Sequence, residues 1–174
     1  GEFYAFPKNY ESMIYFYNKT LFEENGWSLP TNLTEYEALA ETIQAKGMYP
    51  FAYGAQGLQP THEHLAGNNM YKALIGEKKW TDPEFVESLK LLKKHMDAGY
   101  WSGSLENYYA LGWDDFNGQF ANRDSAMLMI GSWGFNPTVS GFADKTDEWD
   151  WAPLPMLTPE GGTPNYQLAI GSTI

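Results

Sequence analysis

The segment over residues 8–11 places a phenol and a carboxylate side by side, in Tyr10 and Glu11. It lies between a short extended run that ends at Pro7 and an aromatic, apolar run over residues 13–17. Large β-preferring residues on both sides of a polar patch predict two strands that flank a loop. A carboxylate can accept hydrogen bonds from two hydroxyl groups, and such charge-assisted bonds are strong. We therefore expect a polar ligand to bind here, the alternative being an exposed surface glutamate.

A second candidate is Trp133, which follows Gly131 and Ser132 after an apolar run over residues 125–130. A strand that ends in this way places the indole at the edge of a sheet, where α/β domains bind their ligands. An indole there could stack on an apolar ligand face. The alternative is a rim tryptophan that packs on its own helix.

The loop over residues 53–64 follows another strand-like run and is rich in Gly, Gln and His. Four of its side chains could bind a hydroxyl group of a ligand: Tyr53, Gln56, Gln59 and His62. The alternative is a solvated loop in which Thr61 caps the next helix. His62 and His64 are two residues apart, whereas paired zinc ligands on one helix face are four apart. We therefore expect no metal site.

The elements that must position these residues follow from hydrophobic periodicity and cap residues. Strands are predicted over residues 3–7, 13–17, 50–54, 125–130, 149–153 and 166–170. Helices are predicted over residues 20–25, 34–47, 61–75, 83–98 and 114–121, and a further helix, interrupted by Pro137, follows Trp133. Strands that alternate with helices predict an α/β layer domain.

Several local features of these helices can also be predicted. Thr34 and Glu37 fit a capping box at a helix start. In the helix that begins at residue 83, the buried stripe is expected to comprise Phe85, Leu89, Leu92 and Met96. His95 on the same helix is expected at the surface. In the turn before residue 125, Asn122 is expected to supply a left-handed conformation.

Composition excludes several classes of protein. A chain of 174 residues with 43% hydrophobic residues can bury a core and is not disordered. Its net charge of −11 argues against nucleic acid or an anionic membrane as partner. The absence of cysteine excludes disulfides, thiolate metal sites and a cysteine nucleophile. Because the chain begins without Met and stops just after a strand-like run, we expect both ends to continue in a longer sequence.

Three motifs resemble the carbohydrate-binding family of extracellular solute-binding proteins that serve bacterial ABC importers. Residues 16–22, F-Y-N-K-T-L-F, are similar to the family's Y-Y-N-K-x-L-F. Residues 120–133 are similar to a helix ending in Phe, a G-K-x-A-M turn, a buried strand and G-S-W. In that turn Asn122, Arg123 and Asp124 depart from the usual Gly-Lys. Residues 151–155, W-A-P-L-P, are similar to the family's V-A-P-L-P.

The resemblance implies one lobe of a two-lobed, periplasmic-binding-protein-like type II fold, with a mixed sheet flanked by helices. Residues 1–174 would form this lobe, with crossover segments near residues 1–18 and 150–174 and the rest of the other lobe absent. Ligand would bind between the lobes, with Trp133 stacked on a sugar ring and Glu11 accepting hydrogen bonds from hydroxyl groups. Sugar rings have apolar C–H faces, and an aromatic content of 17% suits an oligosaccharide.

The resemblance further implies a monomeric receptor with no catalytic activity and no cofactor, which docks on the membrane permease of an ABC importer. Its location would be extracellular, periplasmic or lipid-anchored at the surface of a bacterium. One alternative is a carbohydrate-active enzyme with two facing carboxylates, for which Glu11 with Asp114 or Asp115 could be proposed. The spacing does not support that pair, and both aspartates suit the positive end of a helix dipole. A domain that only contacts other proteins is the remaining alternative.

Overall fold

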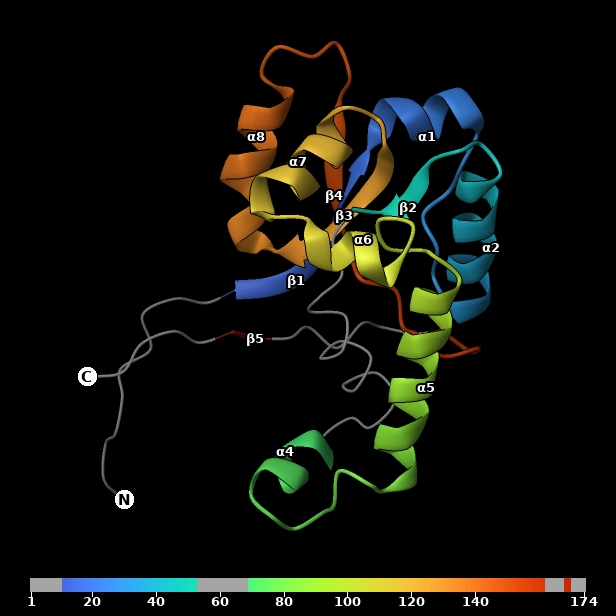
Figure 1. The fold of residues 1–174 in the computed structure, drawn as a ribbon, viewed down its shortest axis with the longest axis vertical. Coiled ribbons are helices and arrows are strands. Elements are labelled where there is room, and N and C mark those ends of the chain that lie inside the picture. Colours follow the sequence, from blue (N-terminus) through green and yellow to red (C-terminus); the bar gives the residue numbers. More distant parts are fainter. Residues whose placement is uncertain (1–10, 53–68, 162–167, 170–174) are drawn as a thin grey trace, which may run out of the picture.

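The computed structural model describes residues 11–52, 69–161 and 168–169. Its centre is a mixed sheet (Figure 1). The strands in spatial order are β2 (Tyr49–Phe51), β3 (Ser125–Gly131), β1 (Glu11–Asn18) and β4 (Trp149–Pro153), and β5 (Leu168–Ala169) pairs with the start of β1. β2 and β3 are parallel, whereas β1 is antiparallel to each of its neighbours. This arrangement confirms the predicted α/β class with a mixed sheet.

Helices cover both faces of the sheet, which explains why β1 is apolar on successive residues. On one face, Tyr15 stacks on Tyr36 of α2 (Leu33–Gln44), with 6.5 Å between the ring centroids. On the same face Tyr17 contacts Phe22 of α1 (Lys19–Asn25). The predicted strand over residues 13–17 and the helix over residues 20–25 are thus confirmed.

The opposite face is covered by α7 (Trp113–Ala121) and α8 (Phe135–Phe142). Phe16 of β1 points toward this face and meets Phe135 edge-on, with 5.0 Å between centroids. Phe120 of α7 packs on Phe142 of α8 and joins the two helices. The predicted interruption at Pro137 does not occur, and α8 is continuous through this residue. Pro137 lies in the first turn, where the backbone N–H that proline lacks has no partner within the helix.

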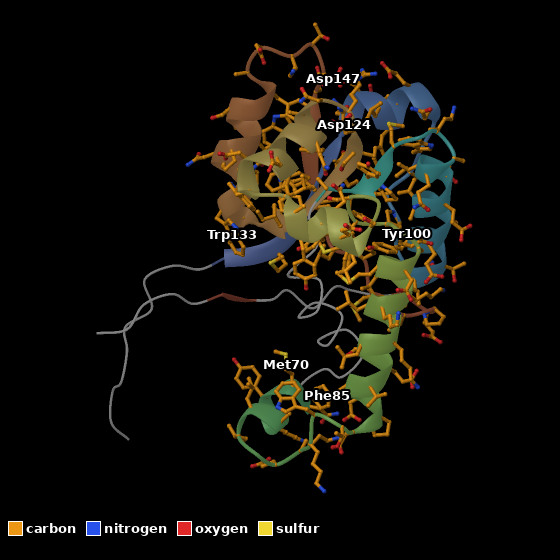
Figure 2. All side chains as sticks on the ribbon, viewed as in Figure 1. Met70, Phe85, Tyr100, Asp124, Trp133 and Asp147 are labelled. Atoms are coloured by element: carbon orange, nitrogen blue, oxygen red, sulfur yellow. The ribbon has the colours of Figure 1, made fainter. Side chains whose placement is uncertain are left out.

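Two helices extend the fold beyond the sheet. α5 (Pro83–Asp97) carries α4 (Asn69–Leu74) at its far end, where Met70 and Ala73 form a small separate core with Phe85 (Figures 1 and 2). The six-residue α6 (Leu105–Ala110) was not predicted, because it buries only Tyr108 and has no apolar periodicity. In the described residues no helix combines the length and hydrophobicity that a membrane crossing requires.

The start of α2 corrects the predicted capping box. The cap is Asn32, whose Oδ1 accepts a hydrogen bond of 2.9 Å from the Glu35 amide, and Thr34 lies inside the helix. The Glu35 carboxylate reaches back to the amide and hydroxyl of Thr31. Glu37 instead contacts α5, so the predicted pattern is displaced by two residues.

The buried stripe of α5 also differs from the prediction. Leu89 is 47% exposed, because this part of the helix extends past the core. His95, expected at the surface, is 2% exposed and packs against the rings of Tyr36 and Tyr100. Its Nε2 lies 2.9 Å from Oε1 of Glu37, and that contact supplies the polar partner that a buried imidazole needs.

The turn between α7 and β3 is left-handed at Arg123 (φ 65°), whereas Asn122 has a φ of −98°. The prediction that Asn122 supplies this conformation is therefore wrong. The Arg123 guanidinium is held by two carboxylates, those of Asp147 and Glu24, and these bonds stabilise the residue in its strained conformation. The predicted strand over residues 3–7 lies outside the described residues. Parts of the predicted strands over residues 50–54 and 166–170, and of the predicted helix over residues 61–75, also lie outside them.

Candidate functional site

The candidate site is the edge of the sheet at which β1 begins and β3 ends, here called the Trp133 edge (residues 11–13 and 131–134). Met13 of β1 is paired with Gly131, the last residue of β3. Glu11 lies two residues before Met13, and Trp133 lies two residues after Gly131. Because the two strands are antiparallel, both residues lie at the same edge of the sheet. The structure thus brings together the backbone of these two predicted site residues, which are more than a hundred positions apart in the sequence.

The Trp133 indole lies on the backbone of Gly131. A Cβ placed on Gly131 would overlap Cζ3, Cε3 and Cη2 of the indole, and its distances to these three atoms are nearly equal. A Cβ approaching in the ring plane would be much closer to Cζ3 than to its two ring neighbours. The face of the ring therefore lies over Gly131. Trp133 is 36% exposed, so part of the indole is accessible at this edge of the sheet, where Figure 2 labels it.

The residues around Trp133 are fixed by close packing. Residues 132–134 form a single 3₁₀ turn, closed by a hydrogen bond from the Phe135 amide to the Ser132 carbonyl. The Ser132 hydroxyl accepts a hydrogen bond of 3.3 Å from the Ser12 amide, which ties the turn to β1. A Cβ on Gly134 would lie 2.7 Å from Ile130 Cγ2 and 2.9 Å from Phe16 Cε2. The turn that carries the indole is therefore a rigid part of the fold.

The other predicted site residues are not placed. Tyr10, Tyr53, Gln56, Gln59 and His62 lie outside the described residues, as does His64. For Glu11 only the backbone is described. No cluster of three potential metal ligands occurs in the part of the chain that the structure describes. The hydroxyl-binding roles proposed for these residues stay predictions.

No ligand-binding role was predicted from the sequence for two exposed aromatic residues, Tyr109 of α6 and Trp113 at the start of α7. α7 leads into β3 through a tight turn after Ala121, so the start of α7 and the end of β3 lie toward the same end of the sheet. The available signal was an aromatic pair around Gly112, next to a helix start. Asp115 of that start accepts a hydrogen bond of 2.8 Å from the Gly112 amide and so caps α7.

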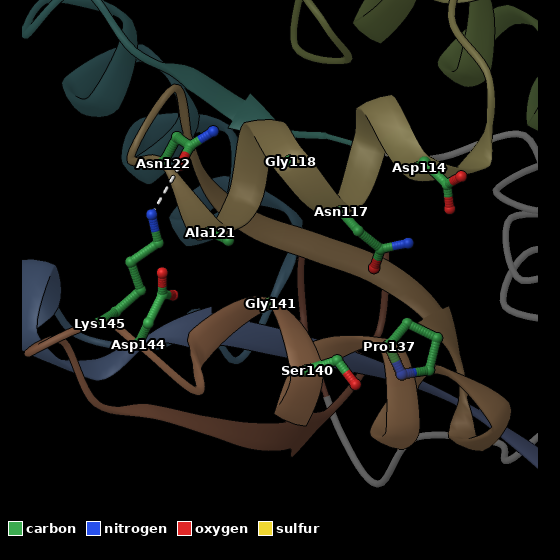
Figure 3. A pocket seen from close by; sticks show the side chains of 10 residues that line it. All are labelled: Asp114, Asn117, Gly118, Ala121, Asn122, Pro137, Ser140, Gly141, Asp144 and Lys145. Atoms are coloured by element: carbon green, nitrogen blue, oxygen red, sulfur yellow. Dashed lines mark hydrogen bonds between the residues drawn. The ribbon is translucent and has the colours of Figure 1, made fainter.

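A separate groove of about 360 Å³ lies between α7 and α8, the two helices that cover one face of the sheet (Figure 3). Small residues widen it, among them Gly118 and Gly141, and a bond from Lys145 to Asn122 crosses one end. Asn117 points into it, and its buried Oδ1 has no hydrogen-bond partner among the described residues. Trp133, the one predicted ligand-binding residue whose side chain the structure describes, does not line this groove.

One cluster of buried titratable groups, formed by His95 and Glu37, lies between α2 and α5, away from the Trp133 edge. Burial lowers the pKa of His95, an effect that the neighbouring Glu37 carboxylate opposes in part. Glu37 also binds Lys94 through both carboxylate oxygens at 2.7 Å. Burial raises the pKa of Glu37, but its bonds to Lys94 and His95 outweigh burial and leave the pKa below its ordinary value. This cluster joins two helices and has the geometry of a structural contact.

Comparison with known proteins gives consistent matches. The model of the family described as bacterial extracellular solute-binding protein matches residues 1–172. A diacetylchitobiose binding protein of Streptomyces coelicolor, NgcE, is 29% identical over 96 residues, which are 54% of this chain and 18% of that protein.

Solved structures are similar over most of the chain. A chitin oligosaccharide binding protein superposes with a TM-score of 0.75 at 22% identity, over 90% of this chain and 40% of that one. The acarbose-binding GacH receptor of Streptomyces glaucescens gives a TM-score of 0.73 at 22% identity, over 98% and 44%. The chain thus spans less than half the length of these structures. At this identity the likeness shows the fold, and it confirms the predicted periplasmic-binding-protein-like architecture.

Proposed function

The chain belongs to the bacterial extracellular solute-binding protein family, and from this premise we propose that the complete protein is a receptor for a carbohydrate. The ligand is an oligosaccharide, bound in a cleft between two lobes and delivered to an ABC importer. Residues 1–174 form one lobe, with crossover segments near 1–18 and 150–174. The remainder of the protein supplies the other lobe and the other half of the site.

The observation that carries this proposal is the partly exposed Trp133 indole at the edge of the sheet, with one face of the ring on the Gly131 backbone. Sugar rings present apolar C–H faces that stack on aromatic rings, while their hydroxyl groups need polar partners. The backbone of Glu11 lies at the same edge, and we propose the Glu11 carboxylate as such a partner. The names of NgcE and of the chitin oligosaccharide binding protein support an oligosaccharide over a single sugar.

Ligand binding would act on the relative position of the two lobes. A ligand that contacts both lobes favours the closed form, by an amount set by its differential affinity for the two forms. The closed receptor then docks on the membrane permease. This role places the protein outside the cytoplasmic membrane, in the periplasm or attached to the cell surface by a lipid anchor, where it acts as a monomer.

No specific observation favours the enzymatic alternative. A glycosidase would need a second carboxylate facing Glu11. Asp115, one of the two candidates, is used in capping α7. Members of this family are binding proteins, so we assign no reaction to the site.

The test is a titration of the complete two-lobed protein with a panel of sugars, followed by intrinsic tryptophan fluorescence. The panel contains N,N′-diacetylchitobiose, longer chitin oligosaccharides, maltotriose, raffinose and the corresponding monosaccharides. We expect saturable binding of at least one oligosaccharide, tighter than that of its monosaccharide. A parallel incubation should leave every sugar intact. Turnover that is abolished by Glu11→Gln would identify an enzyme, and no response to any sugar would exclude a carbohydrate receptor of this kind.

A further inference from the structure

The backbone of Gly131 approaches the Trp133 indole more closely than a residue with a Cβ at this position could. Its backbone φ of −77° and ψ of 170° are accessible to every amino acid, so the conformation does not require glycine. What requires glycine is space, because a Cβ at this position would overlap three atoms of the six-membered ring of the Trp133 indole. The missing side chain therefore forms the surface on which the indole lies.

The backbone on both sides of this contact is fixed. The backbone of Trp133 is fixed within the 3₁₀ turn over residues 132–134, and Gly134 is packed against Ile130 and Phe16. Gly131 is itself held in register by its pair with Met13. A methyl group on Gly131 would therefore turn the indole away from the backbone without moving the strand.

We propose that Gly131 is a positioning residue for ligand binding, which holds one face of the Trp133 indole against the backbone and leaves the other face open. This inference rests on the proposed function of Trp133 as the ring on which a sugar stacks. It adds that the orientation of the ring is set by the residue two positions earlier. Gly131 acts only through Trp133 and has no contact with the ligand itself.

The test is a double-mutant cycle in the complete protein, with Gly131→Ala, Trp133→Ala and the double variant. The probe is whichever sugar of the panel the parent protein binds most tightly. Gly131→Ala should weaken binding roughly fivefold, as expected when a stacked aromatic contact is lost. In the Trp133→Ala background the same change should leave the affinity unaltered. Equal weakening by Gly131→Ala in both backgrounds, or none in the parent, would overturn the proposal.

A matched control is Gly118→Ala, because a Cβ on Gly118 has no atom within 4 Å. This variant should bind as the parent does. If Gly131→Ala alone fails to fold, the double variant decides. It should fold as well as Trp133→Ala does, because removal of the ring removes the overlap. A double variant that is less stable than Trp133→Ala would contradict the proposal.

A spectroscopic readout separates this inference from the proposed function. The near-ultraviolet circular dichroism of the parent, minus that of Trp133→Ala, reports the fixed environment of this indole. Gly131→Ala should lose this difference spectrum, whether or not any sugar binds. If no sugar binds but the spectrum changes as expected, the proposed function fails while the role of Gly131 in orienting the ring stands. An unchanged spectrum would refute that role.

Discussion

Replacing Arg123 with alanine should lower the free energy of unfolding by about 2–3 kcal/mol. The Arg123 guanidinium donates two hydrogen bonds of 2.7 Å to Asp147, whose side chain is only 10% exposed. It donates two more, of 2.9 and 3.1 Å, to the half-exposed Glu24. These bonds connect the turn before β3 with α1 and with the segment before β4.

The magnitude follows from burial. A contact between hydrogen-bonded charged groups contributes about 1.5–3 kcal/mol, and we count the paired bonds to Asp147 as one such contact. Because Arg123 is 39% exposed, solvent screening places this contact toward the lower end of that range. The exposed pair with Glu24 adds no more than about 1 kcal/mol. Asp147 keeps its bond of 2.7 Å from Asn18, so it does not lose every partner.

A second variant tests the backbone part of this reasoning. Arg123 has a φ of 65°, which disfavours alanine by about 1–2 kcal/mol relative to glycine. Glycine is more flexible in the unfolded chain, and this offsets part of that gain. Arg123→Gly should therefore be roughly 1 kcal/mol more stable than Arg123→Ala, although both lose the same bonds.

Urea unfolding of the complete protein, parent and variants side by side, measures these differences. The Arg123 guanidinium holds the pKa of Asp147 below its ordinary value of 3.8. The ion pair therefore stabilises the fold above that pH and loses its effect as the pH falls through the lowered value. The gap between parent and Arg123→Ala should accordingly shrink in strong acid. Parent-like stability of Arg123→Ala at neutral pH, or a lower stability of Arg123→Gly than of Arg123→Ala, would refute the reasoning.

Two further changes test the contacts of α2. Because burial lowers the pKa of His95 below its ordinary 6.5, the folded state binds fewer protons than the unfolded state, and stability should fall as the pH drops below 6.5. His95→Gln should flatten this dependence in thermal unfolding scans between about pH 7 and pH 5, and an unchanged slope would contradict the assignment. Asn32→Ala should lower stability by about 1 kcal/mol through loss of the helix cap. Thr34 is exposed, and Thr34→Ala should stay within about 0.5 kcal/mol of the parent. A larger loss of stability for Thr34→Ala than for Asn32→Ala in urea unfolding would favour the predicted capping box at Thr34 over the cap at Asn32.

The sheet and its helices could be predicted because their signals are local. β3 is a continuous apolar run, and α7 places Phe116 and Phe120 on one face at helical spacing. The strand over residues 149–153 was predicted with the bounds that β4 has. Each of these elements is specified by residues close together in the sequence.

The errors occurred where a residue's environment comes from distant segments. His95 was counted as polar, but its surroundings are aromatic rings and a carboxylate from other elements. Leu89 fits the apolar periodicity of α5, yet it is exposed, because no described element packs on that part of the helix. Arg123 is left-handed where carboxylates over twenty and nearly a hundred positions away hold its guanidinium.

The same distinction applies to the candidate site. The position of Trp133 at the edge of the sheet followed from the end of an apolar strand. Its contact with Gly131 could not be predicted, because it depends on how the 3₁₀ turn folds the indole back over the strand. The pairing of the Glu11 region with Gly131 likewise depends on strand register.

The central claim is that Trp133 forms half of a carbohydrate site, and its most direct test is calorimetric titration of Trp133→Ala in the complete protein. The control is Trp151→Ala, because Trp151 is 48% exposed on β4 and packs on Phe135. We predict that Trp133→Ala weakens oligosaccharide binding by about 1 kcal/mol or more, the scale of a lost aromatic contact. Trp151→Ala should bind as the parent does. Unchanged affinity of Trp133→Ala would contradict the account and move the site away from this edge of the sheet.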